Sequence, residues 1–138
     1  MRPAEVMSEA ARAVAGLSGM RQTWGYPPDD IAVAPSGYVS YPQQGTYDQA
    51  YQRGEDGMTD LAIVLIAGPP GLKQTHELLM AWVAGTGSQS LIEHLSGWSW
   101  ESCDDLSLTT WEIIPETVAG TQYLAAMFKA TVVGPGED

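Results

Sequence analysis

The sequence is poor in cysteine, in basic residues and in long apolar runs, and each scarcity excludes a class of protein. Its 138 residues include one cysteine, Cys103, so no internal disulfide is possible and a reducing compartment is indicated. No segment reaches the roughly 18 consecutive apolar residues that a membrane-spanning helix requires. Glu5 and Glu9 lie where a signal peptide would be apolar. We therefore expect a protein that is made in the cytoplasm and has no membrane partner.

Basic residues are scarce relative to acids. Six Lys and Arg residues stand against 17 Asp and Glu residues, which gives a net charge of −11. A nucleic-acid-binding surface needs a patch of Lys and Arg to neutralise phosphates, so specific DNA binding is not expected. A strongly acidic protein can instead surround DNA without adhering to it, or meet a basic partner surface.

What the sequence has in quantity favours one folded domain. Apolar residues make up 44% of the chain, with five Trp and six Tyr. That content is typical of a globular core rather than of a disordered chain. We expect a single domain over residues 1–138, in which residues 134–138 form a flexible acidic tail.

Apolar periodicity predicts an α/β (α+β) fold. We expect an N-terminal helix and a two-helix insertion packed on a mixed, mostly antiparallel sheet of about five strands. The expected helices cover residues 4–17, 71–84 and 90–95, and the expected strands cover 37–41, 46–52, 60–67, 105–114 and 121–133. Residues 23–35 are expected to be mostly irregular, and residues 43–45 to form a turn.

Side-chain spacing also assigns faces within these elements. In the first helix, Met7, Ala10, Val14 and Leu17 form an apolar stripe, and Glu9 and Arg12 lie off it. The stripe of the second helix consists of Leu72, Thr75, Leu79, Trp82 and Val83. Strict alternation over 105–114 places Leu106 and Leu108 on one face and Trp111 and Ile113 on the other, and Pro115 is expected to end the strand.

No pattern of reactive residues predicts a catalytic, cofactor-binding or metal-binding site. His76, Glu77, His94, Cys103, Asp104 and Asp105 are possible metal ligands, but they form no ligand motif. The acids beside Cys103 would raise the pKa of a thiol nucleophile rather than lower it. The glycines of Gly85-Thr86-Gly87-Ser88 lack the lysine of a phosphate-binding loop. We therefore expect no enzyme and no cofactor.

Loop aromatics leave two interpretations open. Trp98 and Trp100 lie in a loop, where they either pack over the ends of the sheet and helices or anchor a protein interface.

Several segments, in their order along the chain, resemble one protein family. The most characteristic is Tyr47-Asp48-Gln49-Ala50-Tyr51-Gln52-Arg53-Gly54-Glu55-Asp56, followed by an apolar strand. Three other segments add to the likeness: Tyr41-Pro42, the helix that ends in Gly85-Thr86-Gly87-Ser88, and Val118-Ala119-Gly120-Thr121-Gln122-Tyr123-Leu124-Ala125-Ala126. Together they resemble the tail terminator family of siphophages of actinobacteria. Pro69-Pro70-Gly71 and the Trp98-x-Trp100 loop have no counterpart in that pattern.

The resemblance implies a structural virion protein with an α/β sandwich fold. Such proteins form a ring, usually hexameric, that caps the head-proximal end of the tail tube, stops tube polymerisation and joins the tail to the neck. The implied partners are further copies of the chain, the major tail tube protein and a neck (head-completion) protein. DNA passes through the lumen without specific binding, and the protein resides in the virion after assembly in the host cytoplasm.

The subunit-interface residues that we expect are Tyr47, Tyr51, Arg53, Glu55, Asp56, Trp98 and Trp100, the two tryptophans because Trp is enriched at interface hot spots. Arg53 is expected to pair with an acid, within the chain or across the interface. Three alternatives stay open: another head–tail connector, such as a stopper or tail-completion factor; a small acidic protein-binding domain of a cell; and an enzyme that uses Cys103, His94 and a carboxylate.

Overall fold

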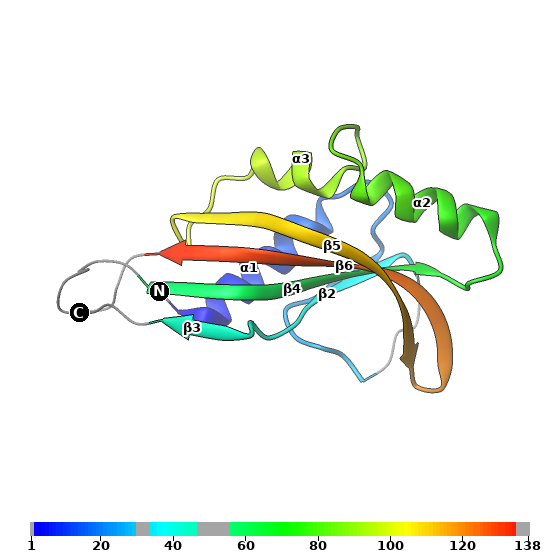
Figure 1. Ribbon diagram of the computed structural model, residues 1–138, viewed down its shortest axis with the longest axis horizontal. Coiled ribbons are helices and arrows are strands. Elements are labelled where there is room, and N and C mark those ends of the chain that lie inside the picture. Colours follow the sequence, from blue (N-terminus) through cyan, green and yellow to red (C-terminus); the bar gives the residue numbers. More distant parts are fainter. Residues whose placement is uncertain (1, 30–33, 47–55, 135–138) are drawn as a thin grey trace.

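A mixed sheet with helices packed on it forms the frame of the molecule (Figure 1). The computed structural model describes residues 2–29, 34–46 and 56–134. The described elements, in chain order, are α1 (Pro3–Ala15), β1 (Gln22–Trp24), β2 (Ser36–Val39), β3 (Gln44–Thr46), β4 (Asp56–Gly68), α2 (Lys73–Val83), α3 (Leu91–Ser96), β5 (Asp105–Val118) and β6 (Thr121–Gly134). The α+β class that the sequence predicts is confirmed.

The strand order is β1-β2-β4-β6-β5, and β3 pairs with β4 beyond the end of β2. All described pairings are antiparallel except the parallel pair β1–β2. The chain passes from β4 through α2 and α3 to β5, and β6 then lies between β4 and β5. Ala119 and Gly120 make the tight turn of the β5–β6 hairpin, with φ angles of 50° and 82°. Two successive residues at positive φ are the geometry that matches the right-handed twist of such hairpins.

All three described helices contribute to one core on one face of the sheet. The apolar stripe predicted for α1 is buried there, as are Leu79 and Trp82 of α2. Val6 and Ala13 of α1 and Leu91 and Leu95 of α3 are also buried. From the sheet, the same core receives Leu61, Ile63, Leu65, Ala126, Phe128, Ala130 and Val132.

On the other face of the sheet, the curved end of β5 lies over part of the face near β2. A second buried cluster, to which no helix contributes, consists of Val64, Ile66, Val118 and Ala125. The hydroxyl of Tyr38 in β2 donates a 3.0 Å hydrogen bond to Oε1 of Glu116 in β5, although β4 and β6 lie between these strands. In Figure 1 the β5–β6 hairpin bends strongly toward its turn. This curvature lets β5 approach β2 over the sheet face.

A bulge in β5 corrects the predicted faces of that strand. Its pairing with β6 shifts between Leu108 and Thr110, so that Leu108 lies opposite Ala130 and Trp111 lies opposite Phe128. Ala130 and Phe128 share the helix-covered face, and directly opposed residues lie on the same face. The prediction that Trp111 and Ile113 lie on the face opposite to that of Leu106 and Leu108 was therefore wrong. The bulge adds one residue to the alternation, so all four side chains lie on the same face.

Pro115 does not end β5, contrary to the prediction. The strand continues to Val118, with Pro115 opposite Leu124. β5 lies at the edge of the described sheet. An edge strand tolerates proline because the missing N–H can fall on the side that has no partner strand.

The N-terminal half of the sheet differs from the prediction in three places. β1 occupies residues that we expected to be irregular, and β3 occupies the expected turn at 43–45. β4 begins at Asp56 rather than at Asp60, because a bulge carries the ladder past Asp60, whose φ is +56°. Aspartate tolerates this left-handed backbone better than most residues. The remainder of the strand expected at 46–52 lies outside the described residues.

β6 also extends further than predicted. Gly134, which we assigned to the acidic tail, is the last residue of β6 and pairs with Asp56. Residues 135–138 lie outside the described part of the chain.

Candidate functional site

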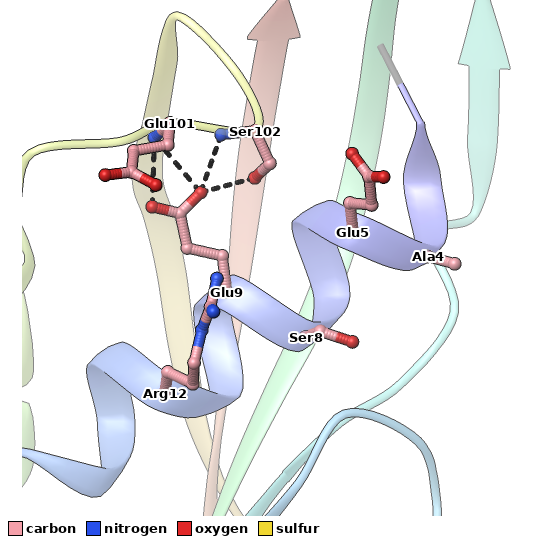
Figure 2. Close-up of a pocket in the computed structure, with 7 residues that line it drawn as sticks. All are labelled: Ala4, Glu5, Ser8, Glu9, Arg12, Glu101 and Ser102. Atoms are coloured by element: carbon pink, nitrogen blue, oxygen red, sulfur yellow. Dashed lines mark hydrogen bonds between the residues drawn. The ribbon is translucent and has the colours of Figure 1, made fainter.

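A buried carboxylate joins α1 to the loop that precedes β5 (Figure 2). Glu9 is 2% exposed. Its oxygens accept hydrogen bonds from the Trp98 Nε1–H at 3.0 Å, from the Glu101 backbone N–H at 2.9 and 3.1 Å, and from the Ser102 backbone N–H at 2.7 Å. The Ser102 hydroxyl donates a further short bond. Figure 2 shows Glu9 pointing to this loop, whereas Ser8 of the same helix points away from it.

These donors hold Glu9 in its ionised form. Burial alone would raise the pKa of Glu9, but the bonds from Ser102, Glu101 and Trp98 outweigh burial and lower the pKa from 4.5 to about 2. The carboxylate is therefore ionised at neutral pH, and its acceptor positions are occupied by donors from this chain. Glu9 acts as an anchor between α1 and the loop rather than as a base for chemistry.

The sequence gives no sign of this role, because Glu9 lies off the apolar stripe of the first helix. Its partners lie 89 to 93 residues further along the chain, so no local pattern pointed to them. A hollow of about 530 Å³ lies beside Glu9, lined by Ala4, Glu5, Ser8, Glu9, Arg12, Glu101 and Ser102.

A second feature runs along β5, where two hollows share lining residues. The first hollow, about 230 Å³, is lined by Trp82, Val83, Gly85, Ile92, Leu108, Thr109, Thr110, Trp111 and Phe128. The second, about 320 Å³, is lined by Ile92, Leu95, Ser96, Trp98, Trp100, Asp105, Leu106, Ser107 and Leu108. Because Ile92 and Leu108 belong to both, we describe the pair together as the β5 trough.

Two large apolar side chains stand exposed at the trough. Trp111 is 51% exposed and Ile92 is 45% exposed. The bulge in β5 is what brings Trp111 to this side of the sheet. Neither residue is among the predicted interface residues, and strict alternation along the strand predicted Trp111 on the opposite face.

The structure brings together two of the predicted interface residues. Trp98 and Trp100 are half-buried against the main core, with ring centroids 6.3 Å apart. Both line the trough, and the Trp98 indole is also bound by Glu9. Packing against the core thus explains the buried part of each indole ring, and the rest of each ring is exposed.

Of the other predicted interface residues, the structure describes only Asp56. Asp56 begins β4 and lies opposite Gly134, at the end of the sheet where β5 begins. Tyr47, Tyr51, Arg53 and Glu55 lie outside the described residues, so neither their contacts nor the expected pairing of Arg53 can be placed.

The candidate reactive residues have structural surroundings. His76 Nε2 lies 3.0 Å from the carbonyl oxygen of Pro70, and His94 Nε2 lies 2.7 Å from that of Ala13. Cys103 is buried, and burial, followed by Glu9 and Asp105, raises the pKa of its thiol to about 11. The thiol is therefore protonated at neutral pH, and its acidic neighbours act in the direction that the sequence predicted.

Residues 2–29, 34–46 and 56–134 contain no group of three His, Cys, Asp or Glu side chains placed to hold a metal ion. Within the same residues, no helix has the length and apolar character needed to cross a membrane. Comparison with protein-family models and with curated proteins found no match.

Charge is distributed unequally along the chain. From α3 through β5, residues 91–118 contain Glu93, Glu101, Asp104, Asp105, Glu112 and Glu116 but no Lys or Arg. The described residues from 2 to 46, which include α1, β1, β2 and β3, contain Arg2, Arg12 and Arg21 against Glu5, Glu9 and Asp29. The segment from α3 through β5 therefore carries only acidic formal charge.

Proposed function

We propose that this protein is a structural virion protein, a phage tail terminator that forms a ring at the head-proximal end of the tail tube. The ring stops tube polymerisation, joins the tail to the neck and lets DNA pass through its lumen. The sequence resemblance supports this role. The α+β architecture, with helices packed on a mixed sheet, agrees with the fold that the resemblance implies.

The observation that carries the proposal is the difference between the two edges of the described sheet. A ring is built from one heterologous contact, in which two different surfaces of the same chain meet and the rotation closes. β5 forms one edge, with an apolar trough and acidic surroundings. β1 and β3 lie at the other edge. Unlike edges favour head-to-tail assembly over pairing of identical surfaces.

The net charge of −11 fits a DNA channel. Acids that face a lumen repel phosphates, so DNA slides through without binding to the wall. The same charge opposes premature association of free subunits through mutual repulsion.

Cryo-electron microscopy of the source particle tests the assignment. We expect a ring of this chain on the last layer of the tail tube, with acidic side chains toward the lumen. A ring one layer higher, against the portal side, would make the protein a stopper instead. Absence of the chain from every particle would refute a virion role and favour a protein-binding domain.

A genetic experiment tests the activity separately from the location. Deletion of the gene should give tail tubes of irregular, extended length that do not join to filled heads. Supplying the purified protein to such an extract should restore tubes of one length. Tubes of normal length in the deletion strain would contradict a terminator function even if the protein is present in the virion.

A further inference from the structure

β5 is a long strand whose outer side has no partner among the described strands. It runs over Asp105–Val118 and lies at the end of the strand order, with β6 on its inner side. The outer side of such a strand carries backbone N–H and C=O groups that can pair with a strand of another chain. A long and regular edge strand promotes uncontrolled association, and soluble proteins interrupt such an edge.

A bulge interrupts β5 in its first half. Leu108 pairs with Ala130 and Thr110 pairs with Lys129, so Thr109 is the extra residue. The Thr109 hydroxyl donates a 3.1 Å hydrogen bond to the Lys129 carbonyl oxygen, which holds the bulge from a side chain. A bulge bends its strand and disrupts the regular spacing of the backbone groups. An incoming strand therefore cannot keep one register across Thr109.

Pro115 interrupts the outer side of β5 a second time. Val118 and Thr121 pair directly beside the two-residue turn of the β5–β6 hairpin, and no register shift separates Val118 from Pro115. Residues that flank such a turn bond to each other, and the bonding then alternates, so that every second residue from Val118 directs its N–H to β6. Pro115 belongs to the other set, whose N–H groups point outward. The donor that Pro115 lacks is therefore an outward one.

The rest of the edge is short and carries exposed acids. Beyond Pro115, Glu116 is held over the sheet face by the hydrogen bond from Tyr38. Between the bulge and Pro115 lie residues 110–114 only, and Glu112 in their middle is exposed. Asp105, at the start of the strand, is exposed as well. Charged side chains on an edge strand oppose the addition of a further strand.

The other end of the strand order is blunted by a different means. β1 has three residues, Gln22–Trp24, and the chain leaves the strand at Gly25 before Pro27 and Pro28. A short edge strand offers few backbone groups to a partner. Neither end of the strand order thus presents a long regular edge.

We propose that the Thr109 bulge, Pro115 and Glu112 together form an edge guard, which prevents β5 from adding a strand of another chain. The edge guard keeps free copies of this protein from associating by extension of the sheet, which gives open filaments where no rotation closes the assembly. The inference does not rest on the proposed function, because it concerns the free protein. It restricts the proposed ring, whose subunits then meet through side chains rather than through one continuous sheet.

An opened variant tests the edge guard. It lacks Thr109 and carries Glu112→Thr and Pro115→Val, so that β5 becomes a regular edge with its outward N–H groups complete. Deletion of Thr109 leaves the other pairings in place, because Thr109 has no partner in the register. We expect the opened variant to self-associate at least about 10-fold more strongly than the wild type in sedimentation.

Single substitutions supply a milder variant and a control. Pro115→Val alone should strengthen self-association by about 2- to 10-fold, which corresponds to one added backbone hydrogen bond. Pro69→Val is the matched control, because Pro69 is exposed in the loop between β4 and α2 and lies on no strand. It should leave the association unchanged. Circular dichroism verifies that each variant is folded, and if the opened variant is not, Pro115→Val decides by the same criteria.

Hydrogen exchange locates the association. In the opened variant, the outward amides of residues 111, 113 and 117 should exchange more slowly at high protein concentration than at low concentration. In the wild type, they should exchange at the same rate at both concentrations. An opened variant that associates no more than the wild type would overturn the proposal, as would association that leaves these amides unprotected. Concentration-dependent protection of the same amides in the wild type would also overturn it.

The edge guard and the proposed function fail in different ways. A ring in virions whose subunits share a continuous sheet through β5 would refute the edge guard and leave the terminator function intact. An edge guard confirmed in a protein that is absent from virions would refute the function and leave the guard intact.

Discussion

Replacing Glu9 by glutamine tests how α1 is held against the loop before β5. The substitution keeps the size of the side chain but exchanges one acceptor oxygen for an NH₂ donor. Both Glu9 oxygens face donors: Trp98 and Glu101 on one side, Ser102 and Glu101 on the other. The new NH₂ group must therefore face an N–H group, and at least one buried donor loses its acceptor.

The magnitude follows from the pKa of Glu9. A fall from 4.5 to about 2 corresponds to at most about 3 kcal/mol in favour of the ionised side chain in the folded state. Leaving one buried donor unsatisfied costs about 1–3 kcal/mol, which is consistent with that value. We therefore expect Glu9→Gln to lower the free energy of unfolding by about 2–3 kcal/mol at pH 7.

Urea unfolding followed by tryptophan fluorescence measures the change. With a slope of about 2 kcal/mol per molar urea, the midpoint should fall by roughly 1–1.5 M. Glu5→Gln is the control, because Glu5 is exposed on the same helix and makes one 3.5 Å contact with Arg2. That substitution should change the stability by less than about 0.5 kcal/mol.

The pH dependence gives an independent check. Because folding lowers the pKa of Glu9, its contribution is complete above the unfolded value of 4.5 and is lost as the pH falls toward about 2. The difference in stability between wild type and Glu9→Gln should shrink over this window. A Glu9→Gln protein within about 0.5 kcal/mol of wild type at pH 7, or a difference that does not change with pH, would refute the anchor.

Three further predictions concern the rest of the fold. Tyr38→Phe should lower the stability by about 1–2 kcal/mol in urea unfolding, because it removes the bond to Glu116. Burial and Glu116 raise the pKa of Tyr38 above about 10, which favours the neutral phenol in the folded state. The free energy of unfolding of the wild type should therefore fall as the pH rises past about 10, and this part of the fall should be missing in Tyr38→Phe. Cys103 should react with a thiol reagent slowly in the folded protein and rapidly in urea, since it is buried and its thiol is protonated; equal rates would contradict its burial. Gly37→Ala should lower the melting temperature, because the added Cβ would lie 3.2 Å from Val14 Cγ1 of α1, with a cost of about 1–3 kcal/mol.

Much of the architecture could be predicted because it depends on local patterns. The stripe of α1 is buried as expected, and so are Thr75, Leu79 and Trp82 of α2. Leu72, also assigned to the second stripe, instead precedes α2 and is 48% exposed. The Ser90 hydroxyl accepts the Glu93 backbone N–H, as predicted for a helix start. The returning bond differs: the Glu93 carboxylate accepts from Gly87 N–H at 2.6 Å. Helical periodicity and capping involve residues three or four apart, so the sequence displays them directly.

The faces of β5 could not be predicted for a physical reason. Strand alternation holds only while each residue has one partner, and a single bulge reverses every face after it. Nothing in Leu108-Thr109-Thr110-Trp111 distinguishes a bulged strand from a regular one. The pairing with β6 decides that Trp111 stands at the trough.

The sequence by itself determined the fold class, the acidity and the main apolar stripes, because these follow from composition and short-range spacing. The tertiary structure alone decided that Glu9 is buried, that Tyr38 reaches Glu116, and that Trp111 and Tyr41 lie at opposite sides of the sheet. Each of these depends on strand order and curvature, which bring together residues as many as 93 positions apart. Such contacts leave no periodic trace in the chain, because their partners are chosen by the packing of the whole sheet.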